Sequence, residues 1–157
     1  AGKHRLNTIT GGPPEAIKNA MSHYRTQLEQ PEADWNPGVL EPVIGATLHI
    51  YLASSNQAAV DRVHQAFPAY HRNLVTLFER YDIPFTDPSL GGNTDLALKL
   101  GVLVAAAPEN AVEKIELLVA ETGLEYLTLS FAWGNLTHKE TMNSLRLFVN
   151  EVMPHFQ

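Results

Sequence analysis

Short apolar runs and longer stretches with helical spacing alternate along this chain. The apolar runs predict strands at residues 5–10, 43–53, 101–107 and 124–132. The run at 43–53 is apolar on both faces, as strands of a parallel sheet covered on both sides tend to be. Between and after these runs, apolar residues recur at spacings of three and four, which predicts an amphipathic helix behind each strand.

The first strand ends at Gly11-Gly12-Pro13-Pro14, and a helix is expected to start at one of the two prolines. Its predicted apolar face comprises Ala16, Ile17, Ala20, Met21, Tyr24 and Leu28. Three prolines and an Asn36-Pro37-Gly38 turn signal predict that residues 30–42 form a loop.

The second helix is expected to begin with a capping box formed by Ser54 and Gln57. Pro68 interrupts its pattern, so we predict a kink or a second helix that continues to about Tyr81. Residues 83–96 are rich in turn signals, and such a long loop is a candidate lid or binding loop.

The last third of the chain contains two further strand and helix units. Pro108 suits the first turn of one helix and Gly123 its end, while Thr137 and Glu140 have the spacing of another capping box. Pro154 is expected to end the last helix. The predicted inward stripe of that helix comprises Met142, Leu145, Phe148, Val149 and Val152.

Strict alternation of strands and helices predicts an α/β fold with a parallel sheet. A small open sheet with helices on both faces and four consecutive units of a (β/α)8 barrel both fit this order. With 157 residues the chain is expected to be a single domain, and it is short of the about 250 residues of a complete barrel. A half-barrel leaves sheet edges and an inner face uncovered, so it is expected to associate with a partner.

Composition narrows the possible functions. The 17 acidic and 11 basic residues give a net charge of −6, and no basic block supports binding to nucleic acid or anionic membranes. No apolar run is long enough to span a bilayer, and we expect a soluble, cytoplasmic protein. The chain has no cysteine, so disulfides and thiolate chemistry are excluded.

The candidate chemistry of individual motifs is limited. The seven histidines show no pattern of two histidines and a carboxylate on one predicted face, so no metal site is predicted. His49 lies within a strand, and its position fits either a side chain that faces a pocket or a hydrogen-bonded structural histidine, of which the second is expected. The sequence has no nucleophile elbow, Walker loop or dinucleotide fingerprint, and it identifies no catalytic residue.

Three stretches carry a resemblance to a known family. The run from Pro108 to Phe156, the NTITGGPPEAIKNAMSHYR stretch and LHIYLASSNQAAVDR resemble the C-terminal half of the bacterial-luciferase-like, flavin-dependent monooxygenases. The resemblance implies the C-terminal half of a TIM-type barrel, FMN as cofactor, and oxidation of a small organic substrate by reduced flavin and O2. It also implies a flavin reductase as a possible partner, and a homodimer or a separate N-terminal half to complete the barrel.

The same resemblance places several residues near the flavin. The loop Thr10-Gly11-Gly12-Pro13 matches the part of the family pattern close to the flavin phosphate, and Asn7 and Thr8 lie on the strand that leads into it. Trp133 matches a position at the mouth of the barrel, although packing alone also explains a tryptophan there. In the loop at Ala107, many relatives have a Gly-Ser pair that this chain lacks.

A second functional class also fits the sequence. The first four strands, which in the family supply much of the flavin pocket and an active-site histidine, have no counterpart here. The alternative to an enzyme is therefore a non-catalytic flavin-binding or interaction module that keeps the fold without the chemistry.

Overall fold

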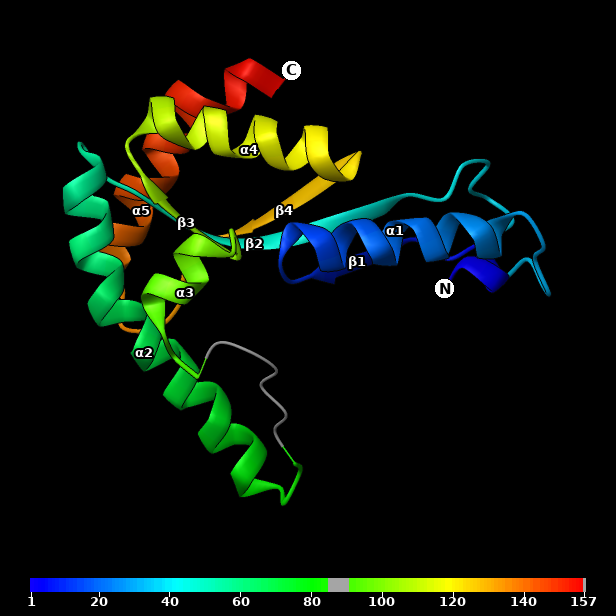
Figure 1. Cartoon of the computed structure of the whole chain (residues 1–157), viewed down its shortest axis with the longest axis horizontal. Helices are drawn as coiled ribbons and strands as arrows, with labels where there is room; N and C mark the ends of the chain where they lie inside the picture. Colours follow the sequence, from blue (N-terminus) through cyan, green and yellow to red (C-terminus); the bar gives the residue numbers. More distant parts are fainter. Residues whose placement is uncertain (85–90, 157) are drawn as a thin grey trace. The chain divides into compact units, whose positions relative to one another are not determined.

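One long strand takes part in every pairing that the described part of the sheet shows. The computed structural model describes residues 1–84 and 91–156. Its strands are β1 (Thr8–Gly11), β2 (Ile44–Leu52), β3 (Leu103–Ala106) and β4 (Tyr126–Ser130). β1 and β3 each pair with β2 in parallel, and β4 also pairs with β2. Parallel strands joined by helices confirm the predicted α/β class (Figure 1).

The chain divides into two compact units, which we describe separately. The first comprises Ala1–Leu48 and Ile115–Leu129, and the second His49–Lys114 and Ser130–Gln157. β2 contributes its first five residues to the first unit and its last four to the second. That the whole chain is one domain stays a prediction.

In the first unit, a 3-10 turn and a helix flank β1. The turn is η1 (Gly2–His4), and the helix is α1 (Pro14–Leu28), which lies along β1 (Figure 1). α1 starts at Pro14, as predicted, and it buries Ile17, Met21 and Tyr24. η1 lies directly against α1, because a Cβ added to Gly2 would lie 2.7 Å from the carbonyl oxygen of Tyr24.

The pairing of β4 also belongs to the first unit. In a barrel built from consecutive units, the fourth strand is expected beside the third, whereas β4 pairs with β2. The two strands approach closely at Gly45, where a Cβ would lie 2.6 Å from the carbonyl oxygen of Tyr126. The Thr128 hydroxyl donates a hydrogen bond to the carbonyl oxygen of Ala46 at 3.2 Å. Only glycine fits at this crossing.

The second unit contains most of the remaining helices. They are α2 (Asn56–Arg80), α3 (Thr94–Lys99), α4 (Pro108–Thr122) and α5 (His138–Leu147), followed by a π-helical turn η2 (Phe148–Val152) and a 3-10 turn η3 (Met153–Phe156). α4 begins in the second unit and ends in the first. The expected end of α4 is confirmed, since Gly123 has a left-handed φ of 64°.

The structure corrects the predicted cap of α2 and one of the two alternatives at Pro68. The cap is Ser55, whose hydroxyl accepts the Ala58 N–H at 3.2 Å, and not Ser54. One helix runs through Pro68 to Arg80, so a second helix is wrong, while a kink at Pro68 stays a prediction. The residues just before the proline, Ala66 and Phe67, are buried, and this packing outweighs the loss of one backbone hydrogen bond.

Two further predictions need correction. The candidate loop at 83–96 ends earlier than expected, because α3 starts at Thr94 with Asn93 as its cap. Residues 85–90 of that loop lie outside the described residues. In α5 and η2, Val149 is 47% exposed, so it does not belong to the buried stripe. Ser144 of α5 is fully buried instead, and its hydroxyl is satisfied there because it accepts the Leu52 N–H at 2.8 Å.

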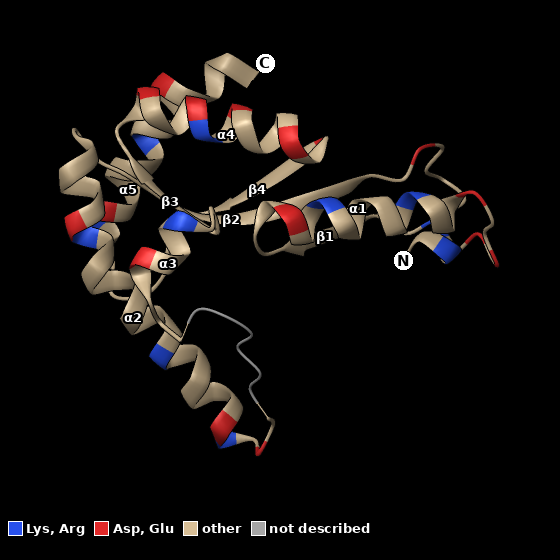
Figure 2. Cartoon of the chain, in the orientation of Figure 1, with Lys and Arg blue, Asp and Glu red and all other residues tan. Residues whose placement is uncertain are grey.

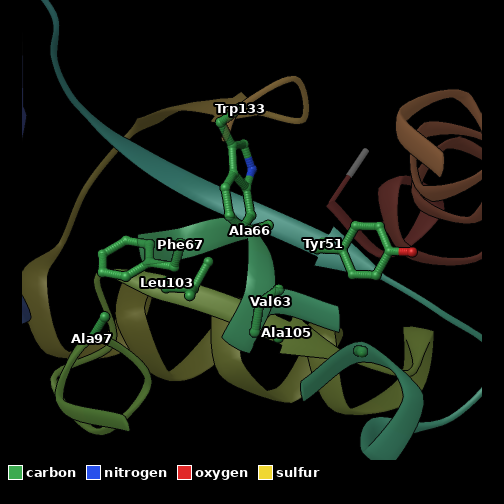
Figure 3. Close-up of a cluster of buried hydrophobic side chains, with 9 residues drawn as sticks. Tyr51, Val63, Ala66, Phe67, Ala97, Leu103, Ala105 and Trp133 are labelled. Carbon is green, nitrogen blue, oxygen red and sulfur yellow. The ribbon is translucent and has the colours of Figure 1, made fainter. Parts of the chain in front are cut away.

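The core of the second unit lies between α2, α3, β2 and β3 (Figure 3). Its buried members are Tyr51, Ala59, Val63, Ala66, Phe67, Ala97, Leu103, Ala105 and Trp133. Four of the nine are alanines, so the helices can pack close to the strands. Trp133 and the two other aromatic side chains fill the space that the alanines leave.

Candidate functional site: the loop between β1 and α1

The predicted phosphate loop connects the end of β1 to the start of α1. Gly11 is exposed, and Gly12 is half-buried with a φ of 127° that non-glycine residues rarely adopt. A Cβ at Gly12 would meet only the Cβ of Ala16, at 3.5 Å, which is ordinary contact. Glycine is therefore required here by backbone conformation, and the backbone at Gly11 is open to an approaching ligand.

The N-terminus of α1 is electrostatically suited to an anion. The side chains of Ser55, Asn93 and Thr137 cap α2, α3 and α5, whereas the N-cap of α1 is Pro13, which makes no side-chain hydrogen bond. The N–H groups of the first turn of α1 are thus free of a side-chain acceptor, at the positive end of the helix dipole. The one opposing feature is the carboxylate of Glu15 in the same turn; α1 carries both signs of charge along its length (Figure 2).

Asn7, Thr8 and Thr10 lie on or beside β1 in the same unit. The side-chain oxygen of Asn7 accepts the Val43 N–H at 2.9 Å and so fixes the start of β2 against β1. Asn7 and Thr8 line a hollow of about 590 Å³ together with Ile9, Val43 and Tyr126. A role of these three polar residues in cofactor binding stays a prediction.

Trp133 belongs to the second unit, so the structure does not group it with the residues around Gly12. It is 6% exposed, and its indole N–H donates to the carbonyl oxygen of Ile50 at 3.3 Å. Its ring packs edge-on against Phe67, with 6.4 Å between ring centroids (Figure 3). These contacts give Trp133 a packing role, and contact with a cofactor stays a prediction.

The loop that contains Trp133 is held to α2 by an ion pair that the sequence did not indicate. The Arg62 guanidinium donates to both carboxylate oxygens of Glu140, at 2.5 and 3.1 Å, and to the side chain and carbonyl oxygen of Asn135. Glu140 also completes the predicted capping box with Thr137. The hydrogen bond from Arg62 is the main reason that the pKa of Glu140 falls to about 2. The capping box could be read from local spacing, but Arg62 lies 78 positions away in sequence.

His49 lies among aromatic rings of the second unit. Its ring is 4.5 Å from that of Tyr70 and 5.6 Å from that of Trp133, measured between centroids. Burial lowers the pKa of His49, so the neutral imidazole is favoured. The expected structural role agrees with this packing, but the expected hydrogen bond is absent from the described residues.

The part of the chain that the structure describes contains neither a metal-binding cluster nor a membrane-spanning helix. Within residues 1–84 and 91–156, no three His, Cys, Asp or Glu side chains gather where they could hold a metal ion. No described helix is long and apolar enough to cross a membrane.

Comparison with known proteins places the chain in a structural class. No protein-family model matches it, and no curated protein matches it in sequence. The solved structures that it resembles include proteins named as monooxygenases and a flavoprotein, and the expected resemblance to flavin-dependent monooxygenases is confirmed at the level of the fold. The fold is accordingly part of a TIM-type barrel.

Three of these structures define the extent of the likeness. Monooxygenase RslO1 from Streptomyces bottropensis aligns with a TM-score of 0.72 and 19% identity over 100% of this chain and 44% of its own. The oxygenating constituent of 3,6-diketocamphane monooxygenase from Pseudomonas putida, in complex with FMN, aligns with a TM-score of 0.66 and 18% identity, over 98% of this chain and 44% of its own. Flavoprotein 390 aligns with a TM-score of 0.62 and 12% identity, over 99% of this chain and 61% of its own. The chain therefore spans less than half the length of the first two proteins.

Proposed function

We propose that this chain forms the phosphate-binding side of a flavin-dependent monooxygenase, which uses reduced FMN and O2 to oxidise a small organic substrate. The observation that carries the proposal is the open glycine loop at the carboxyl end of β1. In TIM-type barrels this end of the strands is where active sites lie. Glycine backbone and an uncapped helix N-terminus together suit the phosphate of FMN.

The residues of this chain would hold the cofactor rather than perform the oxidation. The N–H groups around Gly11 and Gly12 and in the first turn of α1 would bind the phosphate, with Asn7, Thr8, Thr10 and Trp133 as further predicted contacts. Bound reduced flavin supplies the electrons that activate O2. The solved neighbour in complex with FMN supports this choice of flavin.

A partner is expected to complete the barrel. Two large apolar side chains of the first unit, Ile9 and Tyr126, are 51% and 53% exposed, whereas the interior of such a barrel is a packed core. We propose that a second copy of the chain, or a separate N-terminal half-barrel, covers these side chains. A flavin reductase would be a separate source of reduced flavin, and the cytoplasm the expected location.

The partner is tested by multi-angle light scattering of the purified chain. A homodimer is expected, and Ile9→Lys is expected to shift it towards monomer because a buried charge is costly. Leu40→Lys, at an exposed position in the loop at 30–42, is the matched control. A monodisperse wild-type monomer that gains mass only with an added N-terminal half would favour the second kind of partner.

Flavin binding is tested by titrating FMN and reduced FMN into the chain while flavin fluorescence is followed. Gly12→Ala is expected to weaken FMN binding about tenfold, because it distorts the phosphate loop. Gly38→Ala is the control, since a Cβ at Gly38 meets nothing within 4 Å. If neither form of the flavin binds, the proposed function is wrong.

A second readout distinguishes the monooxygenase from the alternative function, a non-catalytic flavin-binding module. Oxygen consumption is measured with FMN, NADH and an added flavin reductase, with and without the chain. Substrate-dependent consumption above that of the reductase alone supports the monooxygenase. Flavin binding without it supports the module.

A further inference from the structure

The first unit contains a second hollow, which Gly11 and Gly12 do not line. It has a volume of about 410 Å³ and lies between η1, β1 and α1. We refer to it as the η1 hollow. Its polar lining residues are Lys3, His4, Thr8, Thr10, His23 and Gln27, together with Tyr24. The volume is within the range of pockets that hold small molecules, about 300–1,000 Å³.

Several polar groups in this lining have no partner in the described chain. The Nδ1 atom of His4 is buried and has no hydrogen-bond partner. The half-buried side chains of Thr8, Thr10 and Gln27 also make no hydrogen bond within residues 1–84 and 91–156. Only the His4 Nδ1 atom is fully buried, and a buried polar atom without a partner is destabilising. The other three side chains are accessible, so their hydroxyl and amide groups are available to a ligand in the hollow.

The walls of the η1 hollow are already fixed by other contacts. The Tyr24 hydroxyl donates to the carbonyl oxygen of Leu6 at 2.7 Å. The His4 ring stacks on Trp35 with 4.0 Å between centroids and 4° between planes, and the backbone N–H of Trp35 donates to the carbonyl oxygen of His4. Arg5 is held at a φ of 54°, a strained conformation for a residue with a side chain. A ligand therefore meets a preformed site.

The chemistry of the lining selects an acidic ligand. No Asp or Glu lines the hollow, although the chain as a whole has a net charge of −6. Lys3 adds a positive group at the rim, where it also pairs with Glu32. Hydroxyl, amide and imidazole groups can donate to a carboxylate, while Ala20 and Ile44 provide apolar contact.

We propose that the η1 hollow binds a small organic acid, with its carboxylate at Thr8, Thr10 and His4 and its apolar body against Ala20 and Ile44. Gly11 and Gly12 do not line this hollow. The proposal assigns Thr8 and Thr10 to the organic acid and not to the flavin, whose phosphate would lie at Gly11 and Gly12. The ligand could be a substrate of the completed barrel or a separate effector.

The test compares benzoate with benzyl alcohol, which has the same apolar ring but no charge. Binding is followed by NMR through the ring protons of His4 and His23. Benzoate is expected to bind and to shift these signals, with benzyl alcohol at least tenfold weaker. Thr10→Val, which keeps the shape and removes the hydroxyl, is expected to weaken benzoate binding about fivefold, in line with the loss of one hydrogen bond.

Two variants keep the test specific. Thr26→Val changes a threonine on α1 outside the hollow and is expected to leave benzoate binding unchanged. His4→Phe keeps a ring to stack on Trp35, removes both nitrogens, and is expected to weaken benzoate if the fold is retained by circular dichroism. Binding that both Thr10→Val and His4→Phe leave unchanged, equal binding of benzyl alcohol, or no benzoate binding would overturn the proposal.

A competition experiment separates this site from the flavin site. If Thr8 and Thr10 contact the organic acid and not the flavin, saturating FMN leaves benzoate affinity unchanged, which is the expected result. If FMN displaces benzoate, the hollow belongs to the flavin site and the second site is excluded. If the chain binds benzoate but no FMN, the organic-acid site stands while the proposed function fails.

Discussion

Two loops of this molecule each lead from a strand into a helix, and they differ in how their polar groups are used. After β4, the indole N–H of Trp133, the side chain of Asn135 and the hydroxyl of Thr137 are all bonded within the second unit. After β1, the glycine loop enters α1 without a side-chain cap. The loop after β4 therefore has a structural role, whereas the loop after β1 has backbone donors that are available to a ligand.

The two loops also show that similar backbone conformations can have different causes. Gly134 and Gly12 both have a positive φ, at 62° and 127°. A Cβ at Gly134 would lie 2.1 Å from the carbonyl oxygen of Ala66, whereas one at Gly12 would meet only ordinary contact. Glycine is thus needed at 134 for close packing and at 12 for conformation alone.

The largest predicted effect is a loss of stability when the loop after β4 is disrupted. Gly134→Ala is expected to lower the free energy of unfolding by about 3–4 kcal/mol, because the backbone of α2 cannot give way. Gly12→Ala is expected to cost about 1 kcal/mol, the cost of a strained φ without a clash. Urea denaturation followed by circular dichroism measures both. Equal losses for the two variants would contradict the distinction between the loops.

A smaller effect is predicted where α5 meets β2. Ser144→Ala leaves the buried Leu52 N–H without an acceptor and is expected to cost about 1–3 kcal/mol. Ser22→Ala, at an exposed position of α1, is the matched control and is expected to change stability by less than about 0.5 kcal/mol. The same denaturation assay applies. A Ser144→Ala variant as stable as its control would show that this hydrogen bond contributes nothing.

The smallest predicted effect concerns pH. The pKa of Glu140 in the folded chain is about 2, below its ordinary value of 4.5, so the unfolded chain binds the proton first. The stabilisation is complete above about pH 4.5 and is lost as the pH falls towards 2. Glu140→Gln is expected to lower stability at pH 6 by about 1–2 kcal/mol and to flatten the profile between pH 5 and pH 2.5.

Glu113→Gln, on the exposed surface of α4, is the control for this profile and is expected to keep the wild-type acid dependence. Urea midpoints measured across the pH range provide the comparison. If Glu140→Gln loses stability on acidification as steeply as the wild type, the Arg62–Glu140 pair does not contribute to acid sensitivity.

Features set by neighbouring residues could be predicted from the sequence. The start of α1 at Pro14, the capping box of Thr137 and Glu140 and the end of α4 at Gly123 all depend on residues within four positions of one another. The cap of α2 is Ser55 and not the predicted Ser54, because the two serines are chemically equivalent and only the backbone selects between them. Local chemistry thus determines where elements begin and end.

Features that depend on distant residues could not be predicted in this way. At Pro68 the sequence predicts either a kink or a second helix, and α2 continues as one helix because Ala66 and Phe67 are buried against the rest of the unit. The pairing of Arg62 with Glu140 joins residues 78 positions apart. The pairing of β4 with β2 likewise follows from tertiary contacts. For the site, the sequence indicated Gly11 and Gly12, but the hollows beside β1 required the structure.

The most direct test of the central claim compares FMN with riboflavin, which lacks the phosphate. If the loop at Gly11 and Gly12 binds the phosphate, FMN is expected to bind at least tenfold more tightly to the wild-type chain by fluorescence titration. Gly12→Ala should remove most of that difference, while Gly38→Ala keeps it. Equal affinities of the wild-type chain for FMN and riboflavin would contradict the account.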